Sequence, residues 1–172
     1  MVTYQVVPER STVWIEASSS VHPIHGEATG LQGELDLTWR GDQLDPGAPV
    51  DMRVRLPVDL LHSGNAVYDA ALRRVVDVNR YPLITGRATE VAPIDVGRYR
   101  VTGEVMFHGV ARTVAGEVTI SGDPVTELVI EGERDFDVTE FGIRPPRILM
   151  LRVYPDVRVR VRAVARPVTI GV

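Results

Sequence analysis

The chain has 172 residues, the size of one domain, and we expect a single domain over residues 1–172. It contains no Cys and no Lys, which excludes disulfides, thiolate metal sites, a thiol nucleophile and Schiff-base catalysis. The net charge is −4, and the absence of a basic excess argues against a nucleic-acid partner.

Apolar and polar residues alternate in eight segments, which is the pattern of strands with one buried face. In chain order these are residues 12–16, 33–39, 50–56, 84–91, 99–105, 114–120, 128–136 and 157–161. Turn residues rich in Gly, Pro and Asp separate many of them, for example at 45–49 and 121–124. Many short strands joined by turns predict an all-β fold, as an antiparallel barrel or sandwich.

One short helix is expected in residues 65–78, where apolar residues recur at helical spacing and Asn65 can cap the first turn. A single helix in a β chain often covers a barrel end. The Pro-rich segment 139–147 is too irregular for a central strand. We expect it to be a loop between the last two long strands, folded over the barrel rim.

The sequence contains no clear catalytic or metal motif. His22 and His25 form an H-x-x-H pattern, but Pro23 and Gly26 argue against a helix there, and His62 is far away in sequence. No Ser lies in a G-x-S-x-G setting, and no Gly-rich phosphate loop leads into a helix. We therefore assign no catalytic residue, no metal site and no cofactor.

Charged residues on the late strands are expected to face solvent. Arg158, Arg160 and Arg162 alternate with Val, and acidic residues on neighbouring strands can pair with them in a cross-strand ladder. Asp135 and Asp137 share a strand face and could form a carboxylate pair, but a surface or capping role is the simpler expectation.

Four segments, in order along the chain, resemble motifs of the YceI-like family. Residues 4–13 (YQVVPERSTV) are similar to its opening Y-x-(I/V)-D-P-x-H-S-x-(I/V), and residues 72–82 (LRRVVDVNRYP) to its helix-to-strand segment. Residues 99–114 (YRVTGEVMFHGVARTV) and 137–143 (DVTEFGI) resemble two later motifs. Val7 replaces the usual Asp and Arg10 the usual His, Gly86 stands where Phe is common, and the usual Arg is replaced by Val138 or shifted to Arg134.

This resemblance implies an eight-stranded antiparallel lipocalin-like barrel that takes a polyisoprenoid or another acyl-like chain into an apolar tunnel. It also implies a possible homodimer. Family members are often secreted or periplasmic, but the first residues show no signal-peptide pattern, so we expect a cytoplasmic location. No apolar run is long enough to predict a membrane span.

The inward strand faces carry mostly medium-sized apolar side chains, and an eight-stranded barrel can be filled or can hold one small ligand. We expect a ligand-lined interior that includes Val13, Ile15, Leu35, Val54, Val101, Val105, Val118 and Ile130. Tyr68, Leu72 and Val75 would gate the entrance, and Tyr81, Phe107 and Phe141 would close one end.

The expected function is non-enzymatic: a carrier or sensor of an apolar small molecule or lipid. Two alternatives stay open. An enzyme on the same barrel would need polar groups that converge in the cavity, with His22, His25 and His62 as candidates. A barrel filled by its own side chains would act through its surface as an interaction module.

Overall fold

The structure is a computed structural model and describes residues 1–169. Its strands are β1 (Val2–Val6), β2 (Thr12–Ser19), β3 (Ile24–Thr29), β4 (Gln32–Leu37), β5 (Trp39–Arg40), β6 (Gln43–Leu44), β7 (Asp51–Pro57), β8 (Leu83–Asp95), β9 (Arg98–Phe107), β10 (Val110–Asp123), β11 (Glu127–Asp137), β12 (Arg147–Ile148) and β13 (Leu151–Pro167). The helix α1 spans Ala66–Val75, and short 3-10 turns occupy Pro8–Arg10, Val58–Leu60 and Val138–Phe141.

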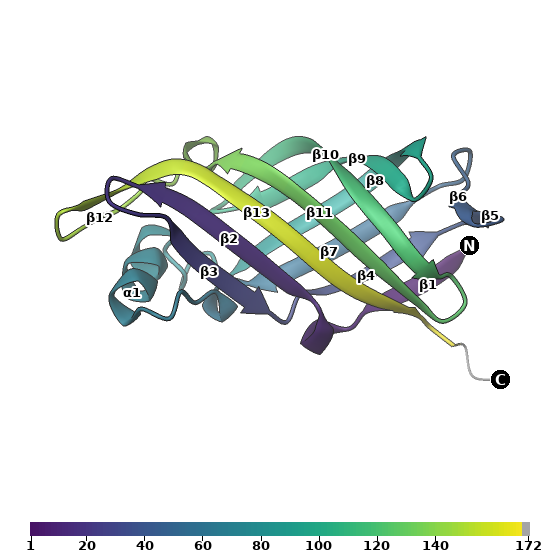
Figure 1. Cartoon of the computed structure of the whole chain (residues 1–172), viewed down its shortest axis with the longest axis horizontal. Coiled ribbons are helices and arrows are strands. Elements are labelled where there is room, and N and C mark those ends of the chain that lie inside the picture. Colours follow the sequence, from purple (N-terminus) through teal and green to yellow (C-terminus); the bar gives the residue numbers. More distant parts are fainter. Residues whose placement is uncertain (170–172) are drawn as a thin grey trace.

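The main sheet closes on itself as an antiparallel barrel (Figure 1). Its eight strands follow the order β1-β4-β7-β8-β9-β10-β11-β13, and β1 returns to β13 through pairs such as Tyr4 with Pro167. Strands β2 and β3 extend the barrel beyond β1 and β4 on the side of α1, with β2 paired to both β13 and β3. The predicted eight-stranded antiparallel barrel with one short helix is therefore confirmed.

A buried serine holds the first strand to its neighbour where that strand is interrupted. The 3-10 turn at Pro8–Arg10 separates β1 from β2 and would leave backbone groups of β13 without partners. The Ser11 hydroxyl donates to the Val7 carbonyl at 2.8 Å and accepts from the Val164 amide at 3.0 Å. Because Ser11 is fully buried, these bonds replace contacts with water that folding removes.

The predicted helix is present but shorter than expected. The Asn65 side chain accepts from the amides of Val67 and Tyr68 at 2.9 and 3.3 Å, which confirms it as the N-cap. The helix ends at Val75, and Asp77 has a left-handed backbone with φ of 50°, so the apolar spacing that continues to residue 78 does not extend it.

Strands β1 and β3 and the two-residue strands β6 and β12 were not predicted. Strand β3 has Gly26 and Ala28 on its inner side, with Glu27 between them and His25 before them, so it lacks the alternation of branched apolar residues that marks the other strands. Its pairing with β2, and not its local sequence, makes it a strand. His25 therefore lies in a strand.

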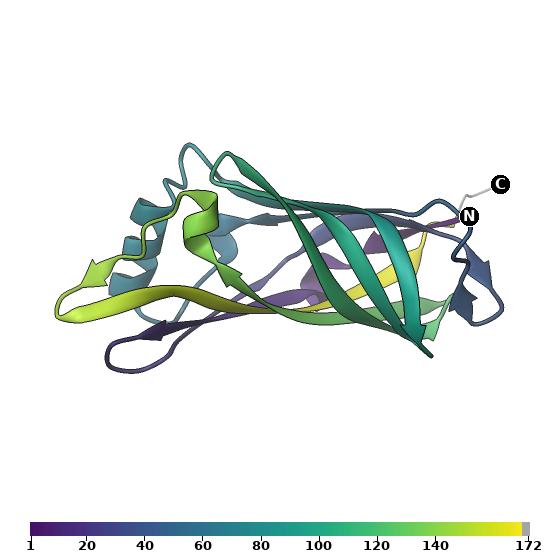
Figure 2. The same ribbon diagram turned by 90° about the horizontal axis from the view of Figure 1, so that it is seen from above.

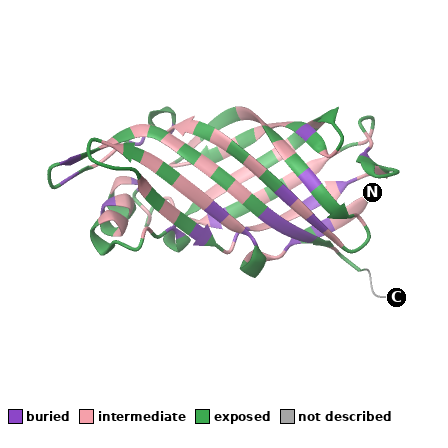
Figure 3. Cartoon of the chain, in the orientation of Figure 1, coloured by how far each residue is buried: buried purple, intermediate pink, exposed green. Residues whose placement is uncertain are grey.

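The two ends of the barrel differ. Helix α1, the turn between β2 and β3, and strand β12 lie at one end, while the N-terminus, the last residues of β13 and the β5–β6 hairpin lie at the other (Figures 1 and 2). Burial alternates along the strands, and buried residues gather towards the end with the hairpin (Figure 3). We call the end with the β5–β6 hairpin the packed end and the end with α1 the helix end.

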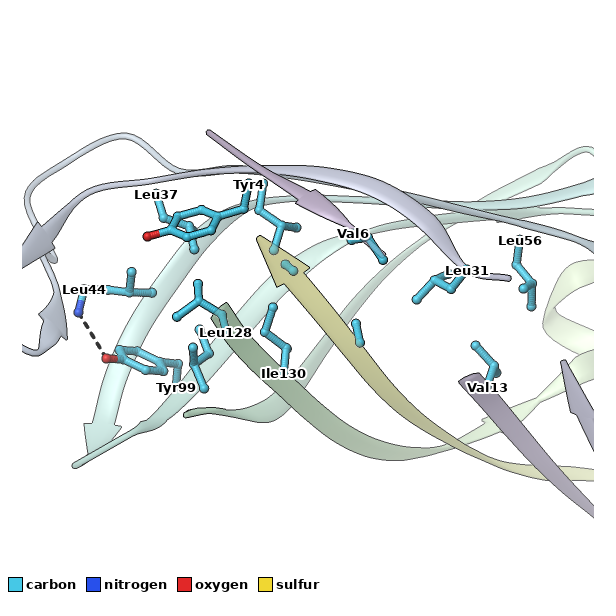
Figure 4. Close-up of a cluster of buried hydrophobic side chains, with 14 of the residues drawn as sticks. Tyr4, Val6, Val13, Leu31, Leu37, Leu44, Leu56, Tyr99, Leu128 and Ile130 are labelled. Carbon is cyan, nitrogen blue, oxygen red and sulfur yellow. Dashed lines mark hydrogen bonds between the residues drawn. The ribbon is translucent and has the colours of Figure 1, made fainter. Parts of the chain in front are cut away.

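The packed end is filled by tyrosine and leucine side chains (Figure 4). The hydroxyl of Tyr4 accepts from Trp39 Nε1 at 2.8 Å and donates to the Pro124 carbonyl at 2.7 Å. The hydroxyl of Tyr99 accepts from the Leu44 amide at 3.1 Å. Burial raises the pKa of Tyr4, so the phenol stays protonated and can keep both bonds. The barrel is closed at this end.

Candidate ligand-binding cavity

A cavity of about 550 Å³ occupies the barrel interior between the packed end and α1. This volume lies within the usual range for small-molecule sites. Its lining is mostly apolar and comes from strands on all sides, from α1 and from the segment after β11. The interior is therefore not filled by its own side chains along its whole length.

The structure places all but one of the predicted site residues on this lining. They are Val13, Ile15, Leu35, Val54, Tyr68, Leu72, Val75, Val101, Val105, Phe107, Val118, Ile130 and Phe141. They lie together because alternate residues of each strand point to the same side, and closure of the sheet turns that side inwards. That these side chains bind a ligand stays a prediction.

Tyr81 is the exception, because it does not line the cavity. It precedes β8, and its ring packs against the turn between β9 and β10, with its centroid 4.7 Å from that of His108. A Cβ on Gly109 of the same turn would lie only 3.0 Å from the Tyr81 ring. Tyr81 thus supports the β9–β10 turn and does not close an end of the cavity.

The cavity exists in part because glycines stand at inward positions of five strands. Gly26, Gly86, Gly103, Gly116 and Gly132 all line it, from β3, β8, β9, β10 and β11 respectively. The room at these positions differs: an added Cβ at Gly103 would clash with the Arg87 carbonyl oxygen of β8, so close strand approach requires that glycine. At Gly116 the space is open, since the nearest atom to an added Cβ is Arg134 Cδ at 3.7 Å. Sequence reasoning missed this role of glycine.

The helix end of the cavity combines α1 with the segment after β11. Tyr68, Leu72 and Val75 of α1 line the cavity there. The expected rim loop forms a 3-10 turn at Val138–Phe141, which buries Phe141 against Phe107 and Phe136 with ring centroids 6.3 and 6.5 Å apart. Apolar side chains from distant parts of the chain therefore meet at this end.

The histidines do not form a convergent polar centre. His25 and His62 are among the residues that line the cavity, whereas His22 is not. All three are exposed, and within residues 1–169 no hydrogen bond joins any two of them. His22 Nε2 lies 3.5 Å from the Tyr68 hydroxyl, and His62 Nε2 lies 3.7 Å from Glu27 Oε1. Nothing in this arrangement favours the enzymatic alternative.

The acidic and basic residues of the late strands pair on the outer surface, as predicted. Arg158 lies 3.0 Å from Asp135 and 3.2 Å from Glu133, and Arg162 lies 3.5 Å from Glu131. Asp137 caps the following 3-10 turn, because its carboxylate accepts from the hydroxyl and the amide of Thr139. These bonds hold the pKa of Asp137 below its usual value.

Strand β11 contains an inward residue that the sequence prediction did not single out. Its inner side runs through Leu128, Ile130, Gly132, Arg134 and Phe136, and Arg134 lines the cavity. The same two-residue alternation that predicts Ile130 as inward continues through Arg134, and this is the signal that could have located it.

Comparison with known sequences identifies the family. The sequence model of the YceI-like domain matches residues 4–165, which is most of the chain. The chain belongs to the YceI-like family. A comparison with curated protein sequences found no relative.

Solved structures of this YceI-like fold agree with the barrel. BcnA of Burkholderia cenocepacia is 18% identical with a TM-score of 0.76, over 92% of this chain and 98% of that chain. A polyisoprenoid binding domain from Saccharophagus degradans is 12% identical with a TM-score of 0.75, over 98% and 100%. A YCEI protein of Campylobacter jejuni is 13% identical with a TM-score of 0.67, over 85% of each chain.

None of the helices within residues 1–169 has the length and apolar character needed to cross a membrane.

Proposed function

We propose that this YceI-like protein is a non-enzymatic carrier or sensor that binds an apolar, chain-like molecule, a polyisoprenoid or another lipid, inside its barrel. The cavity of about 550 Å³ with its mostly apolar lining carries this proposal. The domain from Saccharophagus degradans with the same fold is described as polyisoprenoid binding, which supports it. No convergent set of polar side chains among residues 1–169 favours a reaction in the cavity.

The free energy of such binding depends on the number of buried methylene groups. Each contributes about 0.8 kcal/mol, so a chain with about ten buried carbons gains about 8 kcal/mol before ordering costs reduce it. A micromolar dissociation constant needs about −8 kcal/mol net. Affinity should therefore rise steeply with chain length until the cavity is full.

The first test is native mass spectrometry of the purified protein, followed by organic extraction and identification of any released molecule. We expect an added mass that extraction identifies as an isoprenoid or acyl species. If the protein is free of ligand, the second measurement is the dissociation constant of decanol, dodecanol and hexadecanol. Affinity that does not increase along this series would contradict an apolar binding cavity.

Two finer points belong to the same proposal. We propose that residues 1–172 act as one binding domain, and that the protein forms a homodimer, as the family resemblance implies. Light scattering after size-exclusion chromatography measures the mass of the particle in solution. A monomeric mass at all concentrations would contradict the dimer.

A further inference from the structure

Arg134 differs from every other arginine of the chain. All 19 basic residues are Arg, and in the structure each of them except Arg134 is exposed to solvent. Arg134 lies on the inner side of β11 between Gly132 and Phe136, and it is part of the cavity lining. Arg134 is half-buried, and it places a permanent positive charge in a lining that is mostly apolar.

The protein satisfies only part of this guanidinium. Arg134 Nε donates to the Ala115 carbonyl at 3.0 Å, and Nη1 donates to the Asp135 carbonyl at 3.2 Å. Its Cζ atom lies 4.5 Å from the centre of the Phe136 ring. A guanidinium has five N–H donors, so three have no acceptor among residues 1–169.

No carboxylate balances the charge of Arg134. Within residues 1–169 no acidic oxygen lies within 4.0 Å of it. The nearest acidic residues in sequence, Glu133 and Asp135, pair with Arg158 on the outside of the barrel. Glu117, next to Gly116 on the facing strand, pairs with Arg98. The outer ladder thus uses the carboxylates that could have neutralised Arg134.

The free N–H groups of Arg134 are open to water, because no described residue of intermediate or full burial has a buried side-chain nitrogen without a partner. A guanidinium keeps its charge in a protein, so these groups stay available as charged donors. A ligand that brings an anionic oxygen next to Arg134 would replace this water with charge-assisted hydrogen bonds. Gly116 leaves room beside the side chain, because only Arg134 Cδ comes within 4 Å of an added Cβ there.

We propose that Arg134 is the anchor for the head group of the ligand, and that the ligand is a long-chain molecule with a single negative charge, a carboxylate. This inference rests on the proposed function and specifies its ligand class. A carboxylate matches the planar guanidinium with two parallel hydrogen bonds. Arg134 is the only cationic side chain of residues 1–169 that is not exposed, so a second negative charge on the ligand would stay unpaired in the cavity.

Arg134 also has a structural contact that the test must separate from ligand binding. Backbone pairing between β10 and β11 ends at Val118 and Gly132. Beyond that point, Arg134 Nε donates a hydrogen bond to the Ala115 carbonyl of β10 and so links the two strands. Loss of this contact would affect stability and would weaken all ligands alike. Loss of a head-group anchor would weaken only ligands with an anionic head.

The experiment compares hexadecanoate, hexadecanol and hexadecyl phosphate, which share one chain length and differ in the head group. Dissociation constants are measured by calorimetry at about pH 8, where a carboxylic acid is ionised. The variants are Arg134→Met and, as a matched control, Arg160→Met, whose guanidinium lies 4.3 Å from the ring of Trp14 on the outside. Arg134→Lys keeps the charge and serves if Arg134→Met does not fold.

We expect the wild type to bind hexadecanoate more tightly than either other probe. Arg134→Met should weaken hexadecanoate by about tenfold to a hundredfold and leave hexadecanol unchanged, because a hydrogen bond to a charged group is lost. Arg134→Lys should keep part of the preference, and Arg160→Met should change neither probe.

Three results would overturn the proposal. Equal weakening of acid and alcohol by Arg134→Met would show a structural role only, and tighter binding of hexadecyl phosphate than of hexadecanoate would refute the single charge. If hexadecanol binds but hexadecanoate does not, the role of Arg134 as a head-group anchor is refuted, while the proposed apolar binding cavity is supported. Failure of the proposed function itself looks different, because then none of the three probes binds the wild type.

Discussion

Filling the cavity at Gly116 should reduce affinity by an amount that can be worked out from the structure. Gly116 lines the cavity from β10, and its Cβ position has one atom within 4 Å, at an ordinary contact distance of 3.7 Å. Gly116→Leu adds four carbon atoms, each of which takes roughly the 30 Å³ of a water molecule. The variant therefore removes about 120 Å³, about a fifth of the cavity.

A long ligand in the variant would lose room for about four methylene groups, or about 3 kcal/mol. The dissociation constant of hexadecanol should rise on the order of a hundredfold. Decanol, which needs less of the cavity, should be affected less. Because an added Cβ at Gly116 meets no backbone atom within 4 Å, the thermal midpoint should not fall.

The assay is calorimetric titration with both alcohols, together with thermal unfolding of the free protein. Gly47→Leu is the matched control, since Gly47 is exposed in the turn before β7 and an added Cβ comes no closer than 3.5 Å to the Asp45 carboxylate. If Gly116→Leu distorts the strand, Gly116→Ala gives a smaller loss in the same direction. A folded Gly116→Leu protein with unchanged affinity for hexadecanol would refute the location of the site.

Three further predictions concern the frame around the cavity. Asn65→Ala removes the acceptor for the Val67 and Tyr68 amides and should cost about 0.5–2 kcal/mol in the free energy of unfolding, measured by urea titration; no loss would contradict the cap. Tyr99→Phe leaves the buried Leu44 amide without its partner and should cost about 1–3 kcal/mol, seen as a lower thermal midpoint, whereas Tyr154→Phe at an exposed site should change little. Glu127 accepts hydrogen bonds from Arg10 and Arg166, and these bonds lower the pKa of its carboxyl below the usual 4.5. The contribution of Glu127 to stability is therefore fully present above pH 4.5 and is lost as the pH falls through the folded-state pKa. The stability difference between wild type and Glu127→Gln should therefore shrink in acid, and a difference that persists at low pH would contradict this origin.

The strands could be predicted well where one face is clearly apolar. In β13, Val157, Val159 and Val161 alternate with arginines, and the structure turns the valines inwards and pairs Arg158 and Arg162 with acids outside. Because side chains alternate between the two faces of any strand, the buried face can be predicted without knowledge of the partner strand. Asn65 at the start of α1 is equally local, because its partners are two and three residues away.

The existence of the cavity could not be predicted in the same way. Gly26, Gly86 and Gly116 are far apart in the sequence, and each reads as a neutral position in its own strand. Their absent side chains combine to leave a space only after eight strands have closed with a particular register. Tyr81 shows the opposite error, because this aromatic residue just before β8 packs on a turn near His108 and not in the interior.

Thus the sequence by itself determined the strand faces and the capped helix, which depend on neighbours within a few residues. It also determined that the charged faces point outwards, although their ion pairs join residues of different strands, such as Arg158 and Asp135. Tertiary structure decided the rest. Closure of β1 on β13 joins segments more than a hundred residues apart, and this closure defines an inside. The strand register then determines that the inside is hollow and that Arg134, one arginine among 19, lies within it without a carboxylate partner among the described residues.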